Sequence, residues 1–356
     1  MSPETLVLAA AMSEAVSERD LRGKSYAGAS LCAIVFTQVR LAQVDFRGAD
    51  LREAVFDRCD LSGAIFTGAR LRHAVFDRCA MTHVDLRQAL LQGATFSSCD
   101  LKHGQLGQAS LSMATLSRCD LSGSSLRDAR LVSAVFGECR LHDVSLDGAD
   151  LEHASIQESE LTSPSWEAAR LRHTVFFKSR LAGLRFSGMR LEGCQFAGTD
   201  LSGFDFSDAV LKQCNFQDAR IENASFRRVQ AAMSIFCNAH GSHPDFTGAQ
   251  LPRSLFSAAN LPAAIFDGAN LQQAHFAQAQ LPQSRWVGAD LSHADLSHAQ
   301  LMQADFSQAV LHRSTLHRVQ WGGAIGVESA QAAPHDAELQ RADEWKPALF
   351  TAHSTA

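Results

Sequence analysis

The amino-acid sequence predicts a solenoid of stacked coils, in which each coil takes twenty residues and is divided into four units of five. Three periodicities indicate this fold. Large apolar residues occur at every fifth position from Leu21 to Trp321, and 59 of these 61 positions hold Leu, Phe, Ile, Met, Trp or Tyr. Leu and Phe alternate over long stretches of the series, and cysteines recur every twenty residues. The chain must turn a corner in every unit, because a period of five fits neither a helix nor a flat strand.

Four units per coil follow from the alternation of Leu and Phe. Like side chains stack on like only if each coil holds an even number of units. Two units cannot enclose the apolar side chains, and six would leave a void that close-packed interiors do not tolerate. The cysteine ladder indicates the same coil length, and it consists of Cys59, Cys79, Cys99, Cys119 and Cys139.

Several units share the order Ala, then Asp or Asn, then Leu, as in Ala49-Asp50-Leu51, Ala149-Asp150-Leu151, Ala259-Asn260-Leu261, Ala269-Asn270-Leu271 and Ala289-Asp290-Leu291. In this the chain resembles the pentapeptide-repeat family over about 300 residues. The resemblance implies an all-β fold, a right-handed quadrilateral parallel β-helix with one unit per face. It also implies that the central Leu or Phe and the small residue two positions earlier point inward. With coils about 4.8 Å apart, we expect about 15 coils and a rod about 70 Å long.

The sequence divides into three segments. Residues 1–20 are expected to form an N-terminal helical cap, because Ser2 and Pro3 can start a helix whose Leu6 covers the edge of the first coil. Residues 21–321 are expected to form one continuous β-helix without a hinge. Residues 322–356 are expected to form a C-terminal cap or a flexible tail, with a second helix or disorder between residues 334 and 345.

The composition argues against several classes of protein. The net charge is −6 for 356 residues, and residues 21–321 balance 29 acidic against 29 basic side chains, so no general attraction to nucleic acid is expected. No apolar run is long enough to span a membrane. The apolar N-terminal stretch lacks the basic residues of a secretion signal, so we expect a cytoplasmic protein whose nine cysteines are reduced.

Two clusters resemble chemical sites, and packing offers a simpler interpretation of both. The cysteine ladder occupies the small inward position where Ala is usual, so we expect buried, reduced and metal-free thiols. Cys237, His240 and His243 lie at the one defect in the repeat, residues 231–244, where we expect a kinked or loose coil. Whether these three side chains bind a metal is left open. No nucleophile motif or phosphate loop interrupts the repeat, so the sequence predicts no enzyme activity and no cofactor.

A basic belt runs through one coil, from Arg170 to Arg190, without an acidic residue. Because it spans one coil, the belt should encircle the rod, whereas nucleic acid is bound along a stripe or groove with aromatic platforms. We therefore do not expect nucleic-acid binding, and an acidic partner fits the belt better. The belt consists of Arg170, Arg172, Lys178, Arg180, Arg185 and Arg190.

One outward column is apolar or β-branched where other columns are largely charged or amide. A step of twenty residues along it gives Val35, Val55, Val75, Thr95, Thr115, Val135, Ser155 and Val175. Strand propensity favours β-branched residues, but a contiguous exposed apolar strip also marks interaction sites. Phe177 is expected on the same face. We assign as partner-binding residues Val35, Val55, Val75, Val135, Val175 and Phe177.

The sequence predicts a non-enzymatic protein–protein interaction scaffold that binds through the sides or ends of a rod, because a rod without a cleft lacks the pocket that catalysis needs. The partner is a protein that the sequence does not identify, and a second copy of the chain is one candidate. The family resemblance adds two alternatives. One is a DNA mimic that binds or protects a type II topoisomerase, which would require a strongly negative rod. The other is an accessory component of a bacterial secretion system such as type VI.

Overall fold

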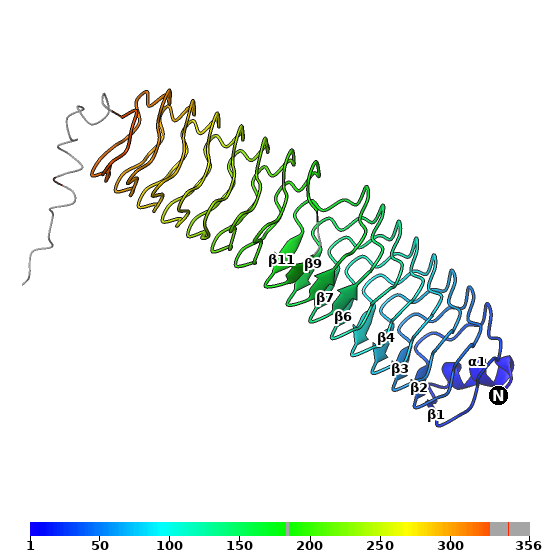
Figure 1. The fold of residues 1–356 in the computed structure, drawn as a ribbon. Coiled ribbons are helices and arrows are strands. Elements are labelled where there is room, and N and C mark those ends of the chain that lie inside the picture. The colour runs from blue at the N-terminus through cyan, green and yellow to red at the C-terminus, as the bar shows by residue number, and fades with distance from the viewer. Residues whose placement is uncertain (183–184, 328–340, 342–356) are drawn as a thin grey trace, which may run out of the picture.

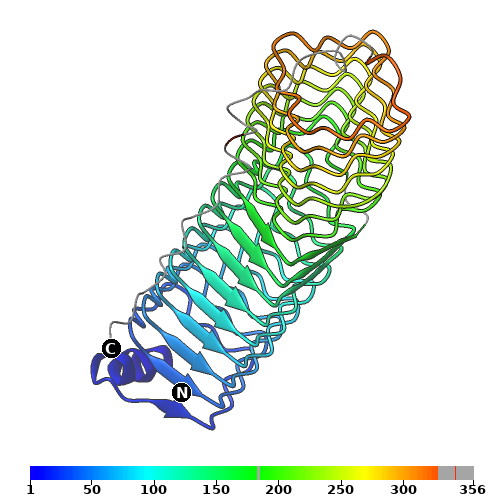
Figure 2. The ribbon, with the colours of Figure 1, turned by 90° about the vertical axis from the view of Figure 1, so that its left-hand side faces the viewer.

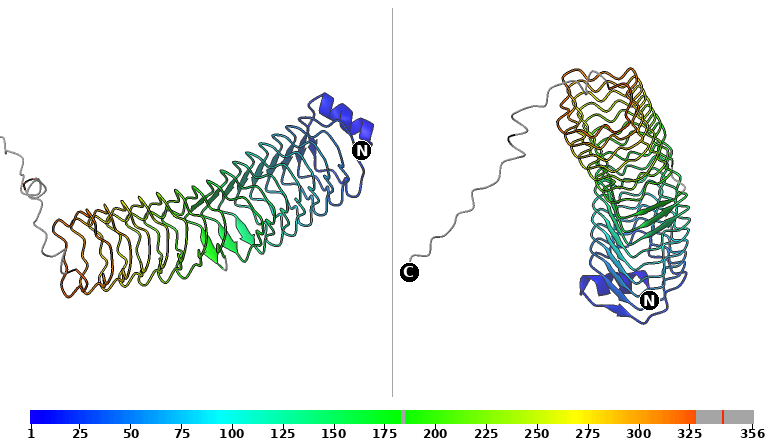
Figure 3. Two further views of the ribbon diagram at one scale, coloured as in Figure 1. Left: turned by 90° about the horizontal axis from the view of Figure 1, so that it is seen from above. Right: turned by 60° about the vertical axis from the view of Figure 1, so that its left-hand side comes forward.

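The computed structural model describes residues 1–182, 185–327 and Arg341. The chain forms a long parallel β-solenoid with a short helix at its N-terminal end (Figure 1). Residues twenty apart pair in parallel, from Val16 with Phe36 to Asp305 with Ile325. Pairing positions follow one another every five residues, so each coil has four faces, as the sequence predicts. The coils stack along one axis in Figure 2, and the rod is gently curved in Figure 3.

Strands of two or three residues lie on two faces of the first half, and most other pairing positions form isolated bridges. The first face is a nine-stranded sheet whose strands follow one another in chain order, namely β1 (Val16–Ser17), β2 (Val35–Thr37), β3 (Val55–Asp57), β4 (Val75–Asp77), β5 (Thr95–Ser97), β6 (Thr115–Ser117), β7 (Val135–Gly137), β9 (Ser155–Gln157) and β11 (Val175–Phe177). The second is a three-stranded sheet of β8 (Arg140–His142), β10 (Glu160–Thr162) and β12 (Arg180–Ala182).

The core consists of the central residues and the small residues two positions before them, and both kinds are buried. Phenylalanine rings from successive coils stack, with 4.9 Å between the centroids of Phe56 and Phe76. Rings on opposite faces meet edge to face, as Phe66 and Phe76 do at 6.2 Å. Both arrangements are favoured by the quadrupoles of the rings. The predicted inward positions are therefore confirmed.

Most corners are held by a local hydrogen-bond network that explains the repeat sequence. The Phe46 carbonyl accepts the Ala49 N–H at 3.0 Å, and Gly48 between them has a φ of +63°. An Asp or Asn before the central residue supports the turn, because Asp45 Oδ1 accepts the Arg47 N–H at 3.0 Å. Short polar side chains satisfy backbone groups at turns in this way.

Helix α1 (Pro3–Ala11) covers the first coil, as predicted. Ser2 is its N-cap and accepts the Thr5 N–H at 3.3 Å, while Leu6 is fully buried against the coil. In the part of the chain that the structure describes, no helix has the length and hydrophobicity that crossing a membrane requires. The C-terminal helix predicted within residues 334–345 lies outside the described residues, except for Arg341.

The backbone ladder is interrupted between residues 168–172 and residues 188–190, and we call this interruption the seam. Within the described residues, no hydrogen bond joins the Leu171 N–H to the Arg190 carbonyl or the Arg190 N–H to the Ala169 carbonyl. One coil earlier, the equivalent bonds of Arg170 measure 2.8 and 2.9 Å. The ladder continues on the next face, where Val175 pairs with Gln195. The ladder is therefore continuous on that face and interrupted on the face of Arg170 and Arg190.

Oversized residues at inward positions explain the seam. Pro164, Met189 and Phe204 occupy positions where most coils have Ala or another small residue. Pro164 also has no N–H, so it cannot make the turn bond that Ala64 donates to Leu61 in a regular coil. Excess side-chain volume in a close-packed interior shifts the backbone. The coils at the seam therefore separate instead of closing at the usual spacing.

The loose coil expected at residues 231–244 is not found. Ala231 is buried, and the chain pairs on both sides of the turn, through His240 with Asn260 and Asp245 with Ile265. Gly241 has a φ of +130°, and a Cβ at this position would lie 2.5 Å from the Glu222 nitrogen. The central apolar residue is absent here because the backbone passes close to the preceding coil, where only glycine fits.

Candidate protein-binding surfaces

The outward face of the nine-stranded sheet places the predicted partner-binding residues in one column. Val35 pairs with Val55, and Val55 pairs with Val75. The register continues through Thr95 and Thr115 to Val135, Ser155 and Val175. These side chains are half-buried, apart from the exposed Thr115. The column is therefore a continuous row of small apolar and hydroxyl groups along the rod.

A second outward column on the same sheet changes in character along the rod. Near its start, Asp57 and Asp77 form a chain of ion pairs with Arg58 and Arg78, with oxygen–nitrogen distances of 2.7–3.4 Å. At its end, β11 presents Phe177, whose side chain is 41% exposed. Both columns are thus uncharged at β11, where Val175 and Phe177 flank the buried Phe176.

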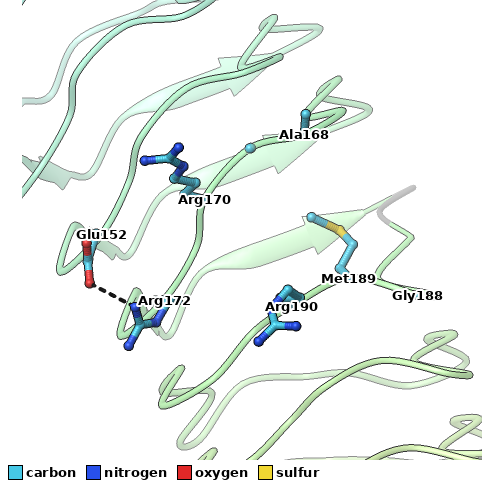
Figure 4. A pocket seen from close by; sticks show the side chains of 8 residues that line it. Glu152, Ala168, Arg170, Arg172, Gly188, Met189 and Arg190 are labelled. Carbon is cyan, nitrogen blue, oxygen red and sulfur yellow. Dashed lines mark ion pairs between the residues drawn. The ribbon is translucent and has the colours of Figure 1, made fainter.

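The basic belt surrounds the seam. A cleft of about 560 Å³ opens there, and Figure 4 shows its walls. Ala169 and Met189, whose counterparts in regular coils are buried, are partly exposed in this cleft. The lining residues are Glu152, Ala168, Ala169, Arg170, Arg172, Gly188, Met189 and Arg190.

The arginines of the cleft differ in how far their charge is compensated. Arg172 lies 3.8 Å from Glu152 and 3.7 Å from Glu192. Arg190 Nη2 donates to Glu192 Oε1 at 2.9 Å. Arg170 forms no ion pair with any residue that the structure describes. Three arginines face one glutamate in the lining, so the cleft carries an excess of positive charge.

The cysteine ladder is buried, as predicted, and its thiols have a role beyond packing. Cys79 Sγ lies 3.2 Å from the Phe56 carbonyl, and Cys99 Sγ lies 3.3 Å from that of Phe76. Cys194 makes the same kind of contact with Leu171 at 2.7 Å, and burial raises the pKa of its thiol to about 12. Each thiol thus donates to a main-chain carbonyl of the preceding coil.

The cluster at the repeat defect is not brought together as a metal site. Cys237 is half-buried, whereas His240 and His243 are exposed. Over the described ranges of the chain, no three or more His, Cys, Asp or Glu side chains are grouped so that they could hold a metal ion.

Reasoning from the sequence located the basic belt but missed the seam and its cleft. The signal for them was present at the inward positions, where Pro164, Met189 and Phe204 stand among small residues such as Ala169 and Cys194. At residues 231–244 the missing apolar residues predict a loose coil, but the ladder is closed there. Volume at the inward position is therefore a better indicator of a broken ladder than a missing central residue.

Two family models match the chain. The model described as a pentapeptide repeat region matches residues 29–106, 49–126 and 89–166. The model described as pentapeptide repeats in eight copies matches residues 190–228, 245–278 and 269–308. These segments leave out residues 167–189, where the seam lies. No curated protein matches the chain.

Solved structures of repeat proteins are similar to the chain at low identity. QnrB1, a plasmid-mediated fluoroquinolone resistance protein, is 20% identical over 51% of this chain and 92% of its own, with a TM-score of 0.38. HetL, a pentapeptide repeat protein involved in heterocyst differentiation regulation in the cyanobacterium Nostoc sp. strain PCC 7120, is 23% identical over 87% of this chain and 88% of its own, with a TM-score of 0.18. A pentapeptide repeat protein of the Arabidopsis thaliana thylakoid lumen is 28% identical over 32% of this chain and 64% of its own, with a TM-score of 0.23.

Proposed function

Since the chain belongs to the pentapeptide-repeat proteins, we propose that it is a non-enzymatic scaffold that binds a partner protein along the outward face of its nine-stranded sheet. The observation that carries this proposal is the in-register column from Val35 to Val175, which ends beside the exposed Phe177. A contiguous exposed apolar surface that includes an aromatic ring is typical of an interaction site.

The energetics suit a complex of modest affinity. Full burial of a valine side chain contributes about 1.5 kcal/mol. Because the valines of the column are already half-buried in the free rod, binding of a partner adds only part of this free energy. Association costs several kcal/mol in lost motion, so the valines need the additional area of Phe177. A partner with a complementary apolar strip, either another protein or a second copy of the chain, fits this surface.

The test places charge on the column. We expect Val135→Asp and Val175→Asp, alone or together, to abolish the complex, because an unpaired carboxylate cannot be buried at low cost. Ile265→Asp is the matched control, since Ile265 is also half-buried and β-branched but pairs with Asp245 and Arg285 on another part of the rod.

Sedimentation velocity reports self-association, and pull-down from the source cell compares the recovered proteins between the variants and the control. Thermal melting confirms that every rod is folded. The proposal is wrong if the variants keep the mass and the recovered proteins of the wild type and of Ile265→Asp.

The charge distribution does not favour the DNA-mimic alternative. Such a mimic requires a line of uncompensated negative charges along the rod. Asp45, Asp50 and Asp85 each form an ion pair with the arginine two residues later, at 2.7–2.8 Å. The topoisomerase and secretion-system alternatives stay predictions from the family resemblance.

A further inference from the structure

The seam exposes main-chain groups that every regular coil pairs with its neighbour. At this point the Ala169 carbonyl and the Leu171 N–H have no hydrogen-bond partner on the next coil, within the described residues. In a regular coil these two groups face the following coil and bond to it. At the seam the cleft of about 560 Å³ lies between the two coils instead. An edge of this kind can accept an added strand.

Charge at the seam selects the kind of chain that can be added. Figure 4 shows Arg170 and Arg190 on neighbouring coils that line the cleft, and Arg172 beside Glu152. Arg170 has no acidic partner among the described residues, so its guanidinium is available to a carboxylate. Guanidinium groups bind carboxylates through paired hydrogen bonds.

We propose that the seam binds an extended acidic segment of a partner protein. The backbone of this segment pairs with the open groups of Ala169 and Leu171, and its carboxylates contact Arg170 and Arg190. The inference goes beyond the scaffold function proposed above and uses a different face of the rod, so either can fail without the other. Half-exposed Met189 and Ala169 provide the apolar floor that a small anion would not use.

Direct binding of a defined peptide tests the proposal. The probe is a fluorescein-labelled peptide of seven glutamates, and fluorescence anisotropy reports its binding to the full chain. We expect a dissociation constant on the order of micromolar and no binding of the matching heptaglutamine. The double variant Arg170→Gln/Arg190→Gln should weaken binding at least about tenfold, because it removes two charged donors.

The repeat supplies a matched control for this variant. Arg70 and Arg130 lie in the same column as Arg170 and Arg190, and their coils are closed, since Leu71 N–H bonds to the Leu90 carbonyl at 2.8 Å. Arg70→Gln/Arg130→Gln removes the same charge and should change binding less than about twofold. If both double variants weaken binding equally, the peptide is attracted by overall charge and the proposal is wrong. If Arg190→Gln disturbs folding, the single variant Arg170→Gln replaces the double variant in this test, because Arg170 is exposed.

Two further probes separate peptide binding from an anion site. Methylation of alternate backbone nitrogens in the heptaglutamate keeps its charge but removes half of its main-chain donors. The proposal predicts that this peptide binds at least about tenfold more weakly. Equal binding of the methylated peptide, or displacement of the probe by micromolar inorganic pyrophosphate, would show an anion site and overturn it.

Discussion

At the scale of single residues, one column of side-chain donors runs through the core of the first half. On the face of the nine-stranded sheet, Phe56 and Phe76 lack the turn bond that closes the other corners, so their carbonyls accept thiols of the next coil. Where the ladder of cysteines ends, hydroxyls replace the thiols. Ser159 donates to the Phe136 carbonyl at 3.3 Å, and Thr199 donates to that of Phe176 at 2.7 Å. The position therefore requires a small donor, because a buried carbonyl without a partner is costly.

Thiol reactivity should follow burial along the chain. Cys32 is exposed and Cys237 is half-buried, whereas the other seven cysteines are buried. Labelling of the native protein with a disulfide reagent should show about one fast thiol, which Cys32→Ser removes, and one slower thiol, which Cys237→Ser removes. All nine should react in denaturant. Rapid labelling of Cys59 to Cys139 in the native rod, or stoichiometric bound zinc, would contradict this assignment.

A corner aspartate makes the stability of the rod depend on pH. Hydrogen bonds from the Arg47 guanidinium hold the pKa of Asp45 at about 2, below its ordinary value near 4. Folding thus favours the ionised form of Asp45. Its contribution to the free energy of unfolding is present above about pH 4 and is lost as the pH falls toward 2. Carboxyl carbon NMR should show Asp45 titrating near pH 2 and Arg47→Gln raising its pKa. A wild-type titration near pH 4 would show that the ion pair is not formed in solution.

At the scale of elements, β11 stands where the two proposed surfaces meet. It is the last strand of the nine-stranded sheet, and its Val175 continues the ladder across the seam to Gln195. Rings of the core also cross at this level, since Phe176 stacks on Phe196 at 5.2 Å. Among the described residues, the coils on the two sides of the seam are therefore joined by the backbone pairing of Val175 and by ring contacts in the core.

Amide hydrogen exchange should reveal the seam directly. The amides of Leu171 and Arg190 lack backbone acceptors among the described residues, whereas Leu131 and Asp150, in the same column, donate at 2.7 and 2.9 Å. We expect the first pair to exchange at least about a hundredfold faster than the second pair, because unpaired amides exchange without opening of the rod. Equal protection of the two pairs would mean that the ladder is closed in solution.

At the scale of the whole molecule, the sequence predicts what repeats and misses what departs from repetition. Every coil makes the same contacts with its neighbours, so a period of five residues suffices to place the central residues and the column from Val35 to Val175. The seam depends on how three oversized side chains, Pro164, Met189 and Phe204, share one interior. Such packing is a property of several coils together and does not follow from the period. That the column binds a partner stays a prediction.

The seam should divide the rod into two units that unfold separately. Stability in a solenoid is the sum of coils and of the interfaces between them, so loss of ladder bonds at one interface weakens the coupling of the two halves. Trp166 lies before the seam and Trp286 beyond it, and variants that keep only one of the four tryptophans, either Trp166 or Trp286, report each half by fluorescence in urea. We expect midpoints that differ by about 1 M, with the Trp286 half more stable.

The order of the two transitions follows from the aromatic core. Beyond the seam, rings stack on both sides of the interior as far as Phe276 and Phe306, as in Phe226 with Phe246 at 4.8 Å and Phe236 with Phe256 at 4.7 Å. In the first half, Leu replaces Phe at positions 116 and 126, which interrupts these stacks. Buried aromatic pairs add about 0.5–1.5 kcal/mol beyond their area. If the two urea transitions superimpose with one common slope, the ring contacts across the seam couple the whole rod. The predicted division of the rod into two unfolding units would then be wrong.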